Sequence, residues 1–460
     1  MDRESIEKLN QNIEYLNSNL ITVNNEWALE EIYARRSSLF KRLIRKFMRP
    51  MWNQQREFNK AVAAALNDIF RNQEIIIRAI SEGEGFEAKP YELGSNGRPR
   101  VIQLVSSLNY GDAVGNEVIA FKRALQEAGY ITEIFAGTIH KRIAPYMAKS
   151  FQRLPELKSD DIVIYHFASE CAMAERIKDF PCRVILRYHN ITPPRFFHGY
   201  DANAEKATAN GLRQVREIRP YIDCCLPVSE FNMQDLQTMG YDCPMHVLPI
   251  LLQLDDYKQD PDEAVIDKYS DGITNILFVG RMAPNKKIED VISAFVEYKK
   301  RYDKAVRLFL VGSFGEEDKY YQFLQKHIAR LKVQDVIFPG HISFAEILGY
   351  YKAADLFLCM SEHEGFCVPL VEAMYFDVPI VAYVSSAITD TLGGSGVLVD
   401  NKDFGKVAEK INQVIHNRNL QEQIIAGQRR RLEDFDQDKI SAQMVGFVGD
   451  MAKEEIRNAI

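Results

Sequence analysis

Residues 355–383, DLFLCMSEHEGFCVPLVEAMYFDVPIVAY, predict a strand, a loop, a helix and a second strand. Residues 355–360 form a short apolar run that is typical of a buried parallel strand, and 361–367 form a polar loop with one glycine. The helix is expected over 368–375, because a proline falls in its first turn, where a missing N–H costs nothing. The second strand follows at 378–383. Ligands of open α/β sheets bind at the carboxyl ends of strands, so the loop is expected at a binding edge.

Two glutamates bracket this turn, Glu364 in the loop and Glu372 inside the helix, with seven residues between them. Gly365 lets the backbone approach a ligand, and the amides at the helix start favour an anion such as phosphate. Glu372 can accept two hydrogen bonds from a ribose diol, and Glu364 can meet a second polyol group. Amides for phosphate and carboxylates for hydroxyls indicate a nucleotide sugar. The glutamate pair by itself would also suit an ordinary strand–helix turn.

Length and composition narrow the class of protein. The 460 residues allow roughly two to four domains, and 46% hydrophobic with 26% charged residues is typical of a globular chain. The net charge of −7 argues against a nucleic-acid binder. The polar start MDRESIEKL is no secretory signal, and no apolar run approaches the ~20 residues that span a bilayer. Seven cysteines without metal-ligand spacing fit a reduced, cytoplasmic setting.

Residues 1–85 predict a helical extension. Its first part has a seam of apolar residues at steps of three and four, which suits either a short coiled coil that joins copies of the chain or one amphipathic helix lying on the body of the protein. The seam residues are Ile6, Leu9, Ile13, Leu16 and Leu20.

A basic amphipathic segment follows within the extension. Residues 35–49 hold many cations and no carboxylate, and both tryptophans of the chain, Trp27 and Trp52, lie in the extension. Such a helix can lie in an anionic membrane interface, or it can pack on the acidic remainder of the protein. A linker rich in glycine, proline and charge follows 53–80, and we place the domain boundary there.

The next part of the chain predicts a Rossmann-like unit. Residues 101–108 form a strand, 109–115 a loop with two glycines, 117–128 a helix and 131–135 a second strand. The loop around Gly111 is not G-x-G-x-x-G, so no dinucleotide site is expected. Further strands are predicted at 161–166, 183–189, 225–229 and 246–250.

Two of these strands end in a histidine. For His166 we expect a packing role within the strand end. His189 opens a proline-rich loop and would face the same edge as Gly111 in a parallel sheet, so we expect it to contact a ligand.

A second α/β domain begins with a strand at 275–279, a loop at 280–287 and a helix at 288–301. A diphosphate needs cations when it leaves water, and Arg281 offers a planar fork and Lys286 a flexible point charge. A solvated basic loop is the alternative. The remaining predicted strands are 307–312, 336–340 and 397–399, and the remaining predicted helices are 344–354, 406–416, 420–435 and 441–460.

These residues resemble glycosyltransferase family 4. Its members carry E-G-F-G and then E-A-M, where this chain has Glu364 and Glu372, and G-R-L-x-x-x-K-G, where it has Arg281 and Lys286. The resemblance covers about residues 100–450. It implies a GT-B fold, an α/β architecture of two Rossmann-like domains facing across a cleft, here behind the N-terminal helical extension.

The resemblance also implies roles for single residues. Arg281 and Lys286 would neutralise the donor diphosphate, Glu372 would hold the ribose, and Glu364 and His189 would orient the sugar. The loop of Gly111 would line the cleft beside the sugar, although Asp112 replaces the second glycine of the family's pair. Lys287 replaces another family glycine. Further donor contacts are expected from Ile342, beside the base, and from Gly365, Phe366, Cys367 and Val368.

The expected activity is a retaining transfer of a hexose from a GDP- or UDP-sugar to a lipid-linked or polysaccharide hydroxyl, with no required metal or other cofactor. The extension resembles those of some bacterial surface-polysaccharide enzymes, which places the protein at the inner face of the cytoplasmic membrane. The expected divisions are 1–85, 86–250 on the acceptor side, 251–435 on the donor side, and a helix at 436–460 that crosses back. The alternatives are a GT-B sugar-nucleotide epimerase and a non-catalytic membrane-associated assembly subunit.

Overall fold

The computed structural model describes residues 90–340 and 342–458. The predicted extension 1–85, with Trp27 and Trp52, and His341 beside the predicted base contact lie outside these residues. The described chain divides into two compact units, a large one of 93–137 and 157–458 and a small one that contains 90–92 and 138–156.

The small unit is held by local contacts. It contains strand β3 (Lys149–Ser150) and the 3-10 helix η2 (Phe151–Arg153). The amide of Tyr91 donates to the carbonyl of Arg153 at 2.8 Å, and the cations of Lys149 and Arg153 lie 5.2 and 5.5 Å from the centre of the Tyr91 ring. These contacts fasten the start of the described chain to η2.

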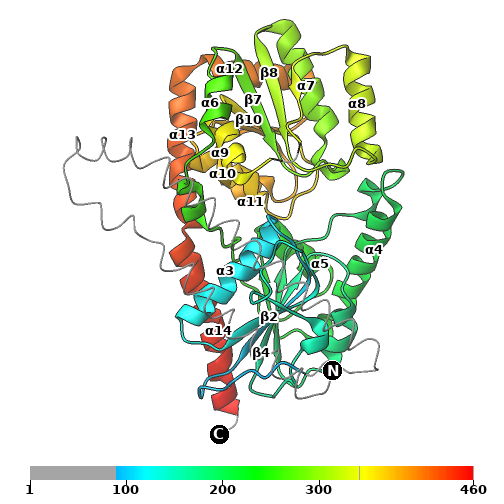
Figure 1. Ribbon diagram of the computed structural model, residues 1–460, viewed down its shortest axis with the longest axis vertical. Helices are drawn as coiled ribbons and strands as arrows, with labels where there is room; N and C mark the ends of the chain where they lie inside the picture. Colours follow the sequence, from blue (N-terminus) through cyan, green and yellow to red (C-terminus); the bar gives the residue numbers. More distant parts are fainter. Residues whose placement is uncertain (1–89, 341, 459–460) are drawn as a thin grey trace, which may run out of the picture. The chain divides into compact units, whose positions relative to one another are not determined.

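The large unit contains two parallel sheets (Figure 1). In the first, the strands of this unit lie in the order β2-β1-β4-β5-β6. Those strands are β1 (Val101–Leu108), β2 (Thr132–Ile139), β4 (Ile162–Phe167), β5 (Arg183–Tyr188) and β6 (Cys224–Pro227). The helices that accompany them are α3 (Ala113–Glu127), α4 (Ala202–Glu217) and α5 (Glu230–Thr238), with the 3-10 turns η3 (Ala172–Asp179), η4 (Pro194–Phe196) and η5 (Arg219–Tyr221).

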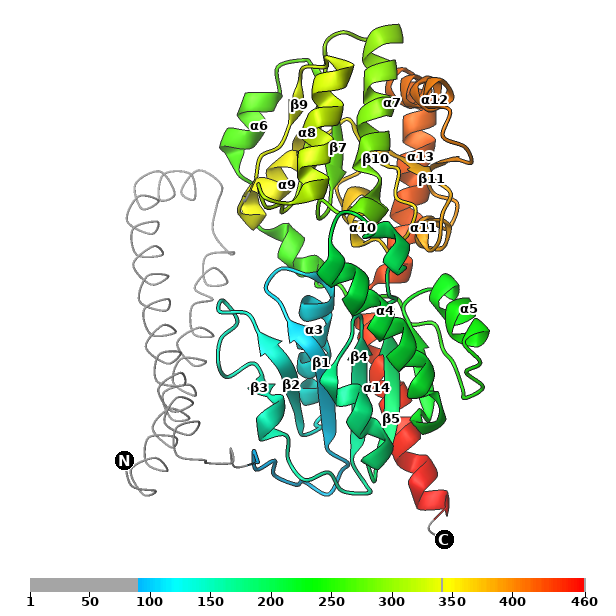
Figure 2. The same ribbon diagram turned by 90° about the vertical axis from the view of Figure 1, so that its right-hand side faces the viewer.

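The second sheet has the order β12-β11-β10-β7-β8-β9. Its strands are β7 (Thr274–Val279), β8 (Val306–Val311), β9 (Val336–Ile337), β10 (Leu356–Cys359), β11 (Ile380–Tyr383) and β12 (Val397–Val399). The helices of this half are α6 (Glu263–Tyr269), α7 (Ile288–Arg301), α8 (Lys319–Leu331), α9 (Phe344–Ala353), α10 (Val368–Tyr375), α11 (Ile388–Leu392), α12 (Phe404–His416) and α13 (Arg418–Leu432). Three 3-10 turns complete it, η6 (Leu254–Lys258), η7 (Pro284–Lys286) and η8 (Glu433–Phe435). Figure 2 shows α7 and α8 side by side on this sheet, where they pack together.

The central strands are buried on both faces, as the apolar runs predicted. Every residue of β4, β8 and β10 is buried, because helices cover both sides of each sheet. The prediction of an α/β fold with two parallel sheets is therefore confirmed.

The last helix, α14 (Gln437–Asn458), packs on the first sheet. Its apolar residues Ile440, Met444 and Val448 join the core that includes Val101 and Phe121. The chain thus passes from the helices of the second sheet back to the first (Figure 1). The predicted domain limits stay predictions.

Some predicted elements differ from the structure. The strand expected at 246–250 is wrong. The amides of His246 and Leu248 donate to the carbonyls of Cys225 and Pro227 in β6, but the nearest bridge, between Met245 and Cys225, is isolated and no strand forms. The final helix begins at 437 rather than 441. Helices α4, α5, α6 and α8 were not anticipated from the sequence.

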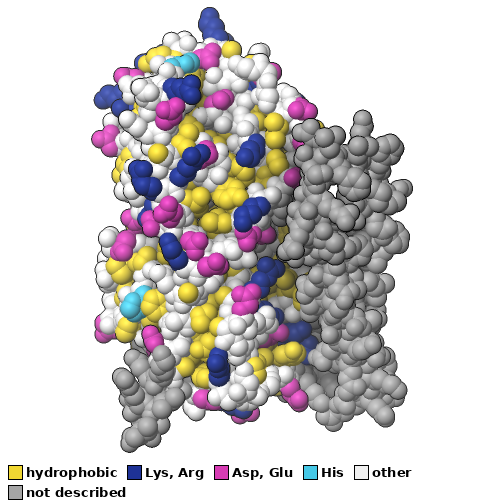
Figure 3. All heavy atoms as spheres, turned by 90° about the vertical axis from the view of Figure 1, so that its left-hand side faces the viewer, with side chains coloured by type: hydrophobic (Ala, Val, Ile, Leu, Met, Phe, Trp, Pro, Cys, Tyr) yellow, Lys and Arg dark blue, Asp and Glu magenta, His cyan; other side chains and the backbone are white. Residues whose placement is uncertain are grey.

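The surface carries charges of both signs. On the face drawn in Figure 3, lysine and arginine side chains alternate with aspartate and glutamate and with small apolar areas. Among the described residues, no helix combines the length and the apolar character needed to cross a bilayer.

Candidate active site

The predicted cation Lys286 and the predicted acid Glu364 meet. The Lys286 ammonium lies 2.7 and 2.6 Å from the two carboxylate oxygens of Glu364. Lys286 ends η7, in the loop after β7, and Glu364 lies in the loop after β10. Because β7 and β10 are neighbours in a parallel sheet, their carboxyl ends bring the two loops together.

The Lys286–Glu364 pair is largely withdrawn from water. The side chains are 20% and 7% exposed. Burial opposes the charge of Lys286, but the neighbouring Glu364 carboxylate outweighs it, so the pKa of Lys286 is raised above its ordinary value. The Glu364 amide also donates to the hydroxyl of Ser386 at 2.8 Å, which fixes the backbone that carries the acid.

Gly365 touches the loop that follows β5 in the first sheet. A Cβ atom on Gly365 would come within 2.3 Å of the His189 carbonyl oxygen and 2.8 Å of the Asn190 Cβ. The close approach therefore requires glycine. The sequence suggested an approach to a ligand, whereas the structure shows an approach to the backbone of His189 and Asn190.

Hydrogen bonds surround this contact. The Ser229 hydroxyl donates to the Gly365 carbonyl at 2.8 Å, and the Phe231 amide donates to Asp390 at 2.7 Å. His363 Nε2 lies 2.7 Å from Asn190 Oδ1. Strand-end loops of the two sheets are thus tied to one another beside Glu364.

His363 is held neutral in this setting. Its surroundings include the rings of Phe196 and Phe231, and burial lowers its pKa from the ordinary 6.5 to about 4. Asn190 Nδ2 donates to Asn232, so Asn190 Oδ1 is the acceptor and His363 Nε2 carries the proton.

His189 lies in a buried polar cluster. Its Nε2 is 3.3 Å from His166 Nδ1 and 3.5 Å from a carboxylate oxygen of Glu117. Arg187 pairs with the same carboxylate at 2.6 and 3.1 Å, and both side chains are fully buried. Burial lowers the pKa of His189 and of His166 well below the ordinary value.

Arg281 follows β7 and is exposed. Burial raises the pKa of Asp112 above its ordinary value, and the charge of Arg281 opposes this rise, so the two groups are within electrostatic reach. Asp112 caps α3 by accepting from the Gly115 amide at 2.5 Å. It replaces the family's second glycine without strain, because its φ is −100°. Gly111 has φ +77°, the left-handed region that favours glycine.

Lys287, which stands at a family glycine position, adopts the conformation of a glycine. Its φ and ψ are both 50°. Its ammonium lies 3.3 Å from Glu289 and 3.8 Å from Glu362. The added positive charge is therefore matched by local acids rather than directed at Glu364.

Glu372 accepts hydrogen bonds from two tyrosines. One carboxylate oxygen accepts from Tyr257 at 2.8 Å and the other from Tyr351 at 2.6 Å. Burial raises the pKa of Glu372, and the two hydroxyls counteract that rise. The tyrosines do not exhaust the carboxylate, since each oxygen has a second lone pair.

Three of the remaining residues that were predicted to contact the sugar donor lie at the start of α10, namely Phe366, Cys367 and Val368. Phe366 and Cys367 are buried, and the Phe366 carbonyl accepts from the Thr391 hydroxyl. Cys367 has φ 75° and does not cap the helix with its side chain, so the amides that begin at Val368 face an end without a side-chain acceptor. Ile342 is half-buried against the same apolar cluster as Cys367.

Among the residues that the structure describes, two groups of side chains have the chemistry of metal ligands. The ligand atoms of Glu117, His166 and His189 lie within 4.8 Å of one another, as do those of Cys359, Glu364 and Cys367. In each group the carboxylate is already paired with a cation, Arg187 or Lys286. A metal would have to displace that cation.

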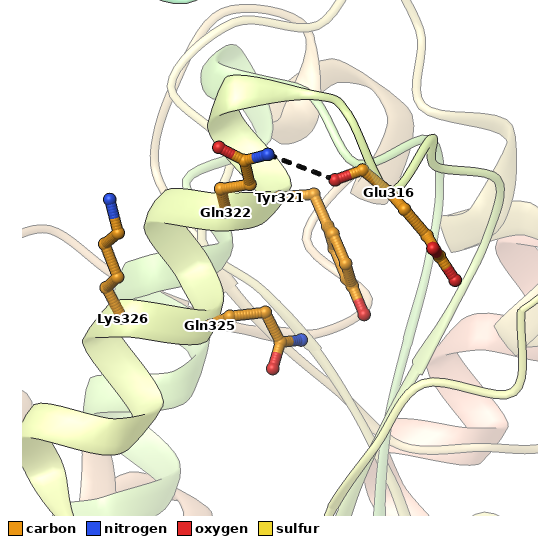
Figure 4. A pocket seen from close by; sticks show the side chains of 5 residues that line it. All are labelled: Glu316, Tyr321, Gln322, Gln325 and Lys326. Carbon is orange, nitrogen blue, oxygen red and sulfur yellow. Dashed lines mark hydrogen bonds between the residues drawn. The ribbon is translucent and has the colours of Figure 1, made fainter.

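A surface pocket lies elsewhere, on α8 and the loop before it (Figure 4). The side chain of Gln322 donates there to the carbonyl of Glu316 at 3.3 Å. None of the predicted site residues lines this pocket, which is formed by Glu316, Tyr321, Gln322, Gln325 and Lys326.

Sequence reasoning missed several residues of the site. No local pattern marks Asn190, His363 or Ser386, which act through contacts between distant loops. Tyr257 and Tyr351 were also missed, because both lie far from Glu372 in the sequence and outside its motif. His166 was expected only to pack, but it contacts His189 directly.

Part of the chain is similar in sequence to known glycosyltransferases. Residues 266–431 match the family model described as Glycosyl transferases group 1. Over 175 residues the chain is 29% identical to the capsular polysaccharide biosynthesis glycosyltransferase CapM of Staphylococcus aureus, a match covering 36% of this chain and 42% of the relative. It is 25% identical over 299 residues to the putative colanic acid biosynthesis glycosyltransferase WcaL of Salmonella typhimurium, covering 63% and 70%.

Solved structures show the same fold. Sucrose-phosphate synthase from Thermosynechococcus elongatus has a TM-score of 0.61 at 16% identity, over 77% of this chain and 99% of that chain. Anabaena Alr3699/HepE in complex with UDP-glucose has a TM-score of 0.59 at 17% identity, over 76% and 99%.

The structure has the GT-B fold, and the second half of the chain is similar to the Glycosyl transferases group 1 family. The residues that match the Glycosyl transferases group 1 model run from α6 to α13, the part of the chain that carries Arg281, Lys286, Glu364 and Glu372. The prediction of this fold is confirmed, and the match of residues 266–431 supports the predicted glycosyltransferase activity, while the retaining mechanism stays a prediction.

Proposed function

We propose that this chain transfers a hexose from a nucleoside-diphosphate sugar to a lipid-linked or polysaccharide hydroxyl in the synthesis of a bacterial surface polysaccharide. The Lys286–Glu364 ion pair beside the contact between Gly365 and His189 carries the proposal. The ion pair supplies a cation and an acid, and the backbone of His189 meets Gly365, so three strand-end loops come together here. Relatives named for capsular, colanic acid and O-antigen synthesis support the class of acceptor.

The proposed chemistry is electrostatic. A diphosphate that reaches the start of α10 would take Lys286 as its counter-ion, with Arg281 as a second cation. Glu364, relieved of Lys286, could then accept hydrogen bonds from sugar hydroxyls. Positive charge and helix amides that meet a leaving diphosphate lower the barrier, because the negative charge on the phosphate grows in the transition state.

Other donor contacts complete the proposal. Glu372 would take a ribose hydroxyl on the lone pairs that Tyr257 and Tyr351 leave, Ile342 would lie by the base, and His189 would meet the sugar. We further propose that transfer proceeds with retention at the anomeric carbon and without a metal. Association with the inner face of the cytoplasmic membrane through residues 1–85 remains a proposal that rests on the basic sequence 35–49.

The test is transfer from a panel of GDP- and UDP-sugars to polyprenyl-diphosphate and oligosaccharide acceptors, with and without a chelator. Glu364→Ala is expected to lose about 100-fold or more in turnover while it stays folded. Glu362→Ala is the matched control, because Glu362 lies in the same loop but pairs with Lys402 at 2.6 Å. The anomeric configuration of the product, read by NMR, tests retention.

Three outcomes would count against the proposal. Turnover of Glu364→Ala near that of the unchanged protein would remove Glu364 from the site. An isomerised nucleotide sugar without a glycosylated acceptor would indicate an epimerase. Binding of no nucleotide sugar by calorimetry would favour a non-catalytic assembly subunit. For the membrane proposal, deletion of 1–85 should abolish flotation with anionic liposomes, and unchanged flotation would refute it.

A further inference from the structure

Three buried polar side chains of the first sheet form a line that ends at His189. Gln103 on β1 lies 3.0 Å from Nε2 of His166 on β4, and Nδ1 of His166 lies 3.3 Å from Nε2 of His189 at the end of β5. Gln103, His166 and His189 are 0%, 1% and 8% exposed. Hydrogen bonds within the protein, rather than water, therefore determine which ring nitrogen of each histidine carries the proton.

The Gln103 amide satisfies its surroundings in one orientation. With its nitrogen toward His166, it donates to His166 Nε2 at 3.0 Å and to the Val118 carbonyl at 3.2 Å, and its oxygen accepts from the Lys122 amide at 3.2 Å. The opposite orientation sets the amide oxygen against the Val118 carbonyl and the amide nitrogen against the Lys122 N–H. The backbone of α3 thus fixes the direction of the amide, independently of either histidine.

The direction of the amide determines the tautomers. His166 Nε2 accepts from Gln103, so in a neutral His166 the proton is on Nδ1. That Nδ1–H donates to His189 Nε2, so in a neutral His189 the proton is likewise on Nδ1. Burial keeps both rings neutral, since it lowers the pKa of each.

The charged groups that face the line do not reverse this assignment. Glu117 Oε2 lies 3.5 Å from His189 Nε2, longer than a good hydrogen bond. The same carboxylate already accepts from Arg187 and from the Leu251 amide at 2.8 Å. Glu117 therefore needs no proton from His189.

Nδ1 of His189 is left as a buried donor without an acceptor. It makes no hydrogen bond within the described chain, although it is shielded from water. A buried donor of this kind destabilises the protein unless a ligand accepts its hydrogen bond. The His189 carbonyl lies against Gly365, next to Glu364, so the ring belongs to the edge where the sugar is expected.

We propose that Gln103 and His166 are positioning residues that keep the proton of His189 on Nδ1, so that this nitrogen donates a hydrogen bond to a hydroxyl oxygen of the transferred sugar. The inference rests on the proposed function for the identity of the sugar. The Nδ1–H group of His189 would favour a sugar that presents an oxygen lone pair to it. Because the ring is neutral, this hydrogen bond adds no charge to the site.

The direct test is NMR of the full chain labelled with ¹⁵N at histidine, which distinguishes protonated from unprotonated ring nitrogens. His166→Gln and His189→Gln assign the signals. We expect both histidines to carry the proton on Nδ1 at neutral pH. A proton on Nε2 of His189 in the unchanged protein would overturn the inference, whether or not any transfer is detected.

A variant separates positioning from packing. Gln103→Met keeps the volume but removes the donor, so we expect a mixture of tautomers at His166 and His189. We also expect a roughly three- to tenfold loss of kcat, the value of one hydrogen bond, with KM for the donor little changed. Gln214→Met is the control, because Gln214 is also buried in this sheet domain but accepts from the Cys171 amide. Tautomers unchanged by Gln103→Met would refute the role of Gln103.

The sugar contact has its own readout. Donor sugars that lack one hydroxyl at a time should each be tested with the unchanged protein and with Gln103→Met. For the hydroxyl that His189 meets, the loss caused by removing it should shrink in the variant, because the two changes remove the same hydrogen bond. If transfer occurs but the losses are independent for every hydroxyl, the sugar contact is wrong. If no donor is turned over while the Nδ1 tautomer is observed, the proposed function fails and the assignment of the protons stands.

Discussion

The ammonium of Lys286 contacts both carboxylate oxygens of Glu364, at 2.7 and 2.6 Å, so each group supplies the counter-ion of the other. The pair is mostly buried, and neither residue could be replaced by a neutral one without leaving a charge that has lost its partner. The arrangement links folding to ligand binding, because a diphosphate and Glu364 would compete for the same ammonium.

Lys286→Met is expected to lower the free energy of unfolding by about 1–3 kcal/mol, because it leaves Glu364 as an unpaired acid that is 7% exposed. It should also weaken binding of nucleoside diphosphates. Urea unfolding and calorimetry with GDP and UDP measure the two effects. Lys402→Met is the control, since Lys402 is 21% exposed and pairs with Asp290 and Glu362. It should destabilise the fold but leave nucleotide affinity unchanged, and an equal loss of affinity in both variants would contradict the assignment.

Gly365→Ala is expected to destabilise the protein by about 1–3 kcal/mol, because the new methyl group would lie 2.3 Å from the His189 carbonyl oxygen and force the two loops apart. Transfer activity should fall in parallel, since His189 and Glu364 would separate. Thermal unfolding and turnover are the measurements. Gly446→Ala tests the specificity of the clash, because a Cβ there meets nothing within 4 Å and alanine favours the helix. An equally stable Gly365→Ala variant would show that the contact is not tight.

Sequence reasoning predicted the elements whose patterns are local. The helix over 368–375 and the strand over 397–399 have the predicted limits, because an apolar run or a proline marks their ends. The amphipathic α8 was missed, although its apolar face is regular, because none of the motifs lies in this helix. The strand expected at 246–250 failed because an apolar run of that length can equally well cross between domains.

The site was predictable as a list of residues but not as a set of contacts. The motifs supplied Lys286 and Glu364, whose pairing follows from adjacent parallel strands. They could not reveal that Gly365 serves the backbone of His189, or that tyrosines hold Glu372, since both facts depend on residues far apart in the chain. The protons of His189 depend on Gln103, which no motif marks.

The stability of the protein should fall as the pH drops below 6.5, in part because of His363. Its folded pKa of about 4 lies below the ordinary 6.5, so the unfolded chain binds more protons between these values. The contribution of His363 is fully present above pH 6.5 and is lost toward pH 4. Between pH 6.5 and 5 this amounts to about 2 kcal/mol.

His363→Gln should flatten this dependence. The glutamine amide can still donate toward Asn190, but it does not titrate. Urea unfolding at pH 7 and pH 5 measures the difference in slope. A slope unaltered in His363→Gln would mean that His363 is not held neutral by the fold.

Tyr351→Phe is expected to raise the pKa of Glu372 further, because one of the two hydroxyls that stabilise its carboxylate is lost. An acid with a folded pKa above its unfolded value weakens the fold as the pH rises through that interval. The variant should therefore lose about 0.5–1.5 kcal/mol at pH 7 and less at pH 4, in urea unfolding at the two values. Tyr350→Phe is the control, because burial and a hydrogen bond with Tyr269, rather than Glu372, determine the pKa of Tyr350. A loss of stability in Tyr351→Phe that is the same at both pH values would show that the hydroxyl does not support the charged form of Glu372.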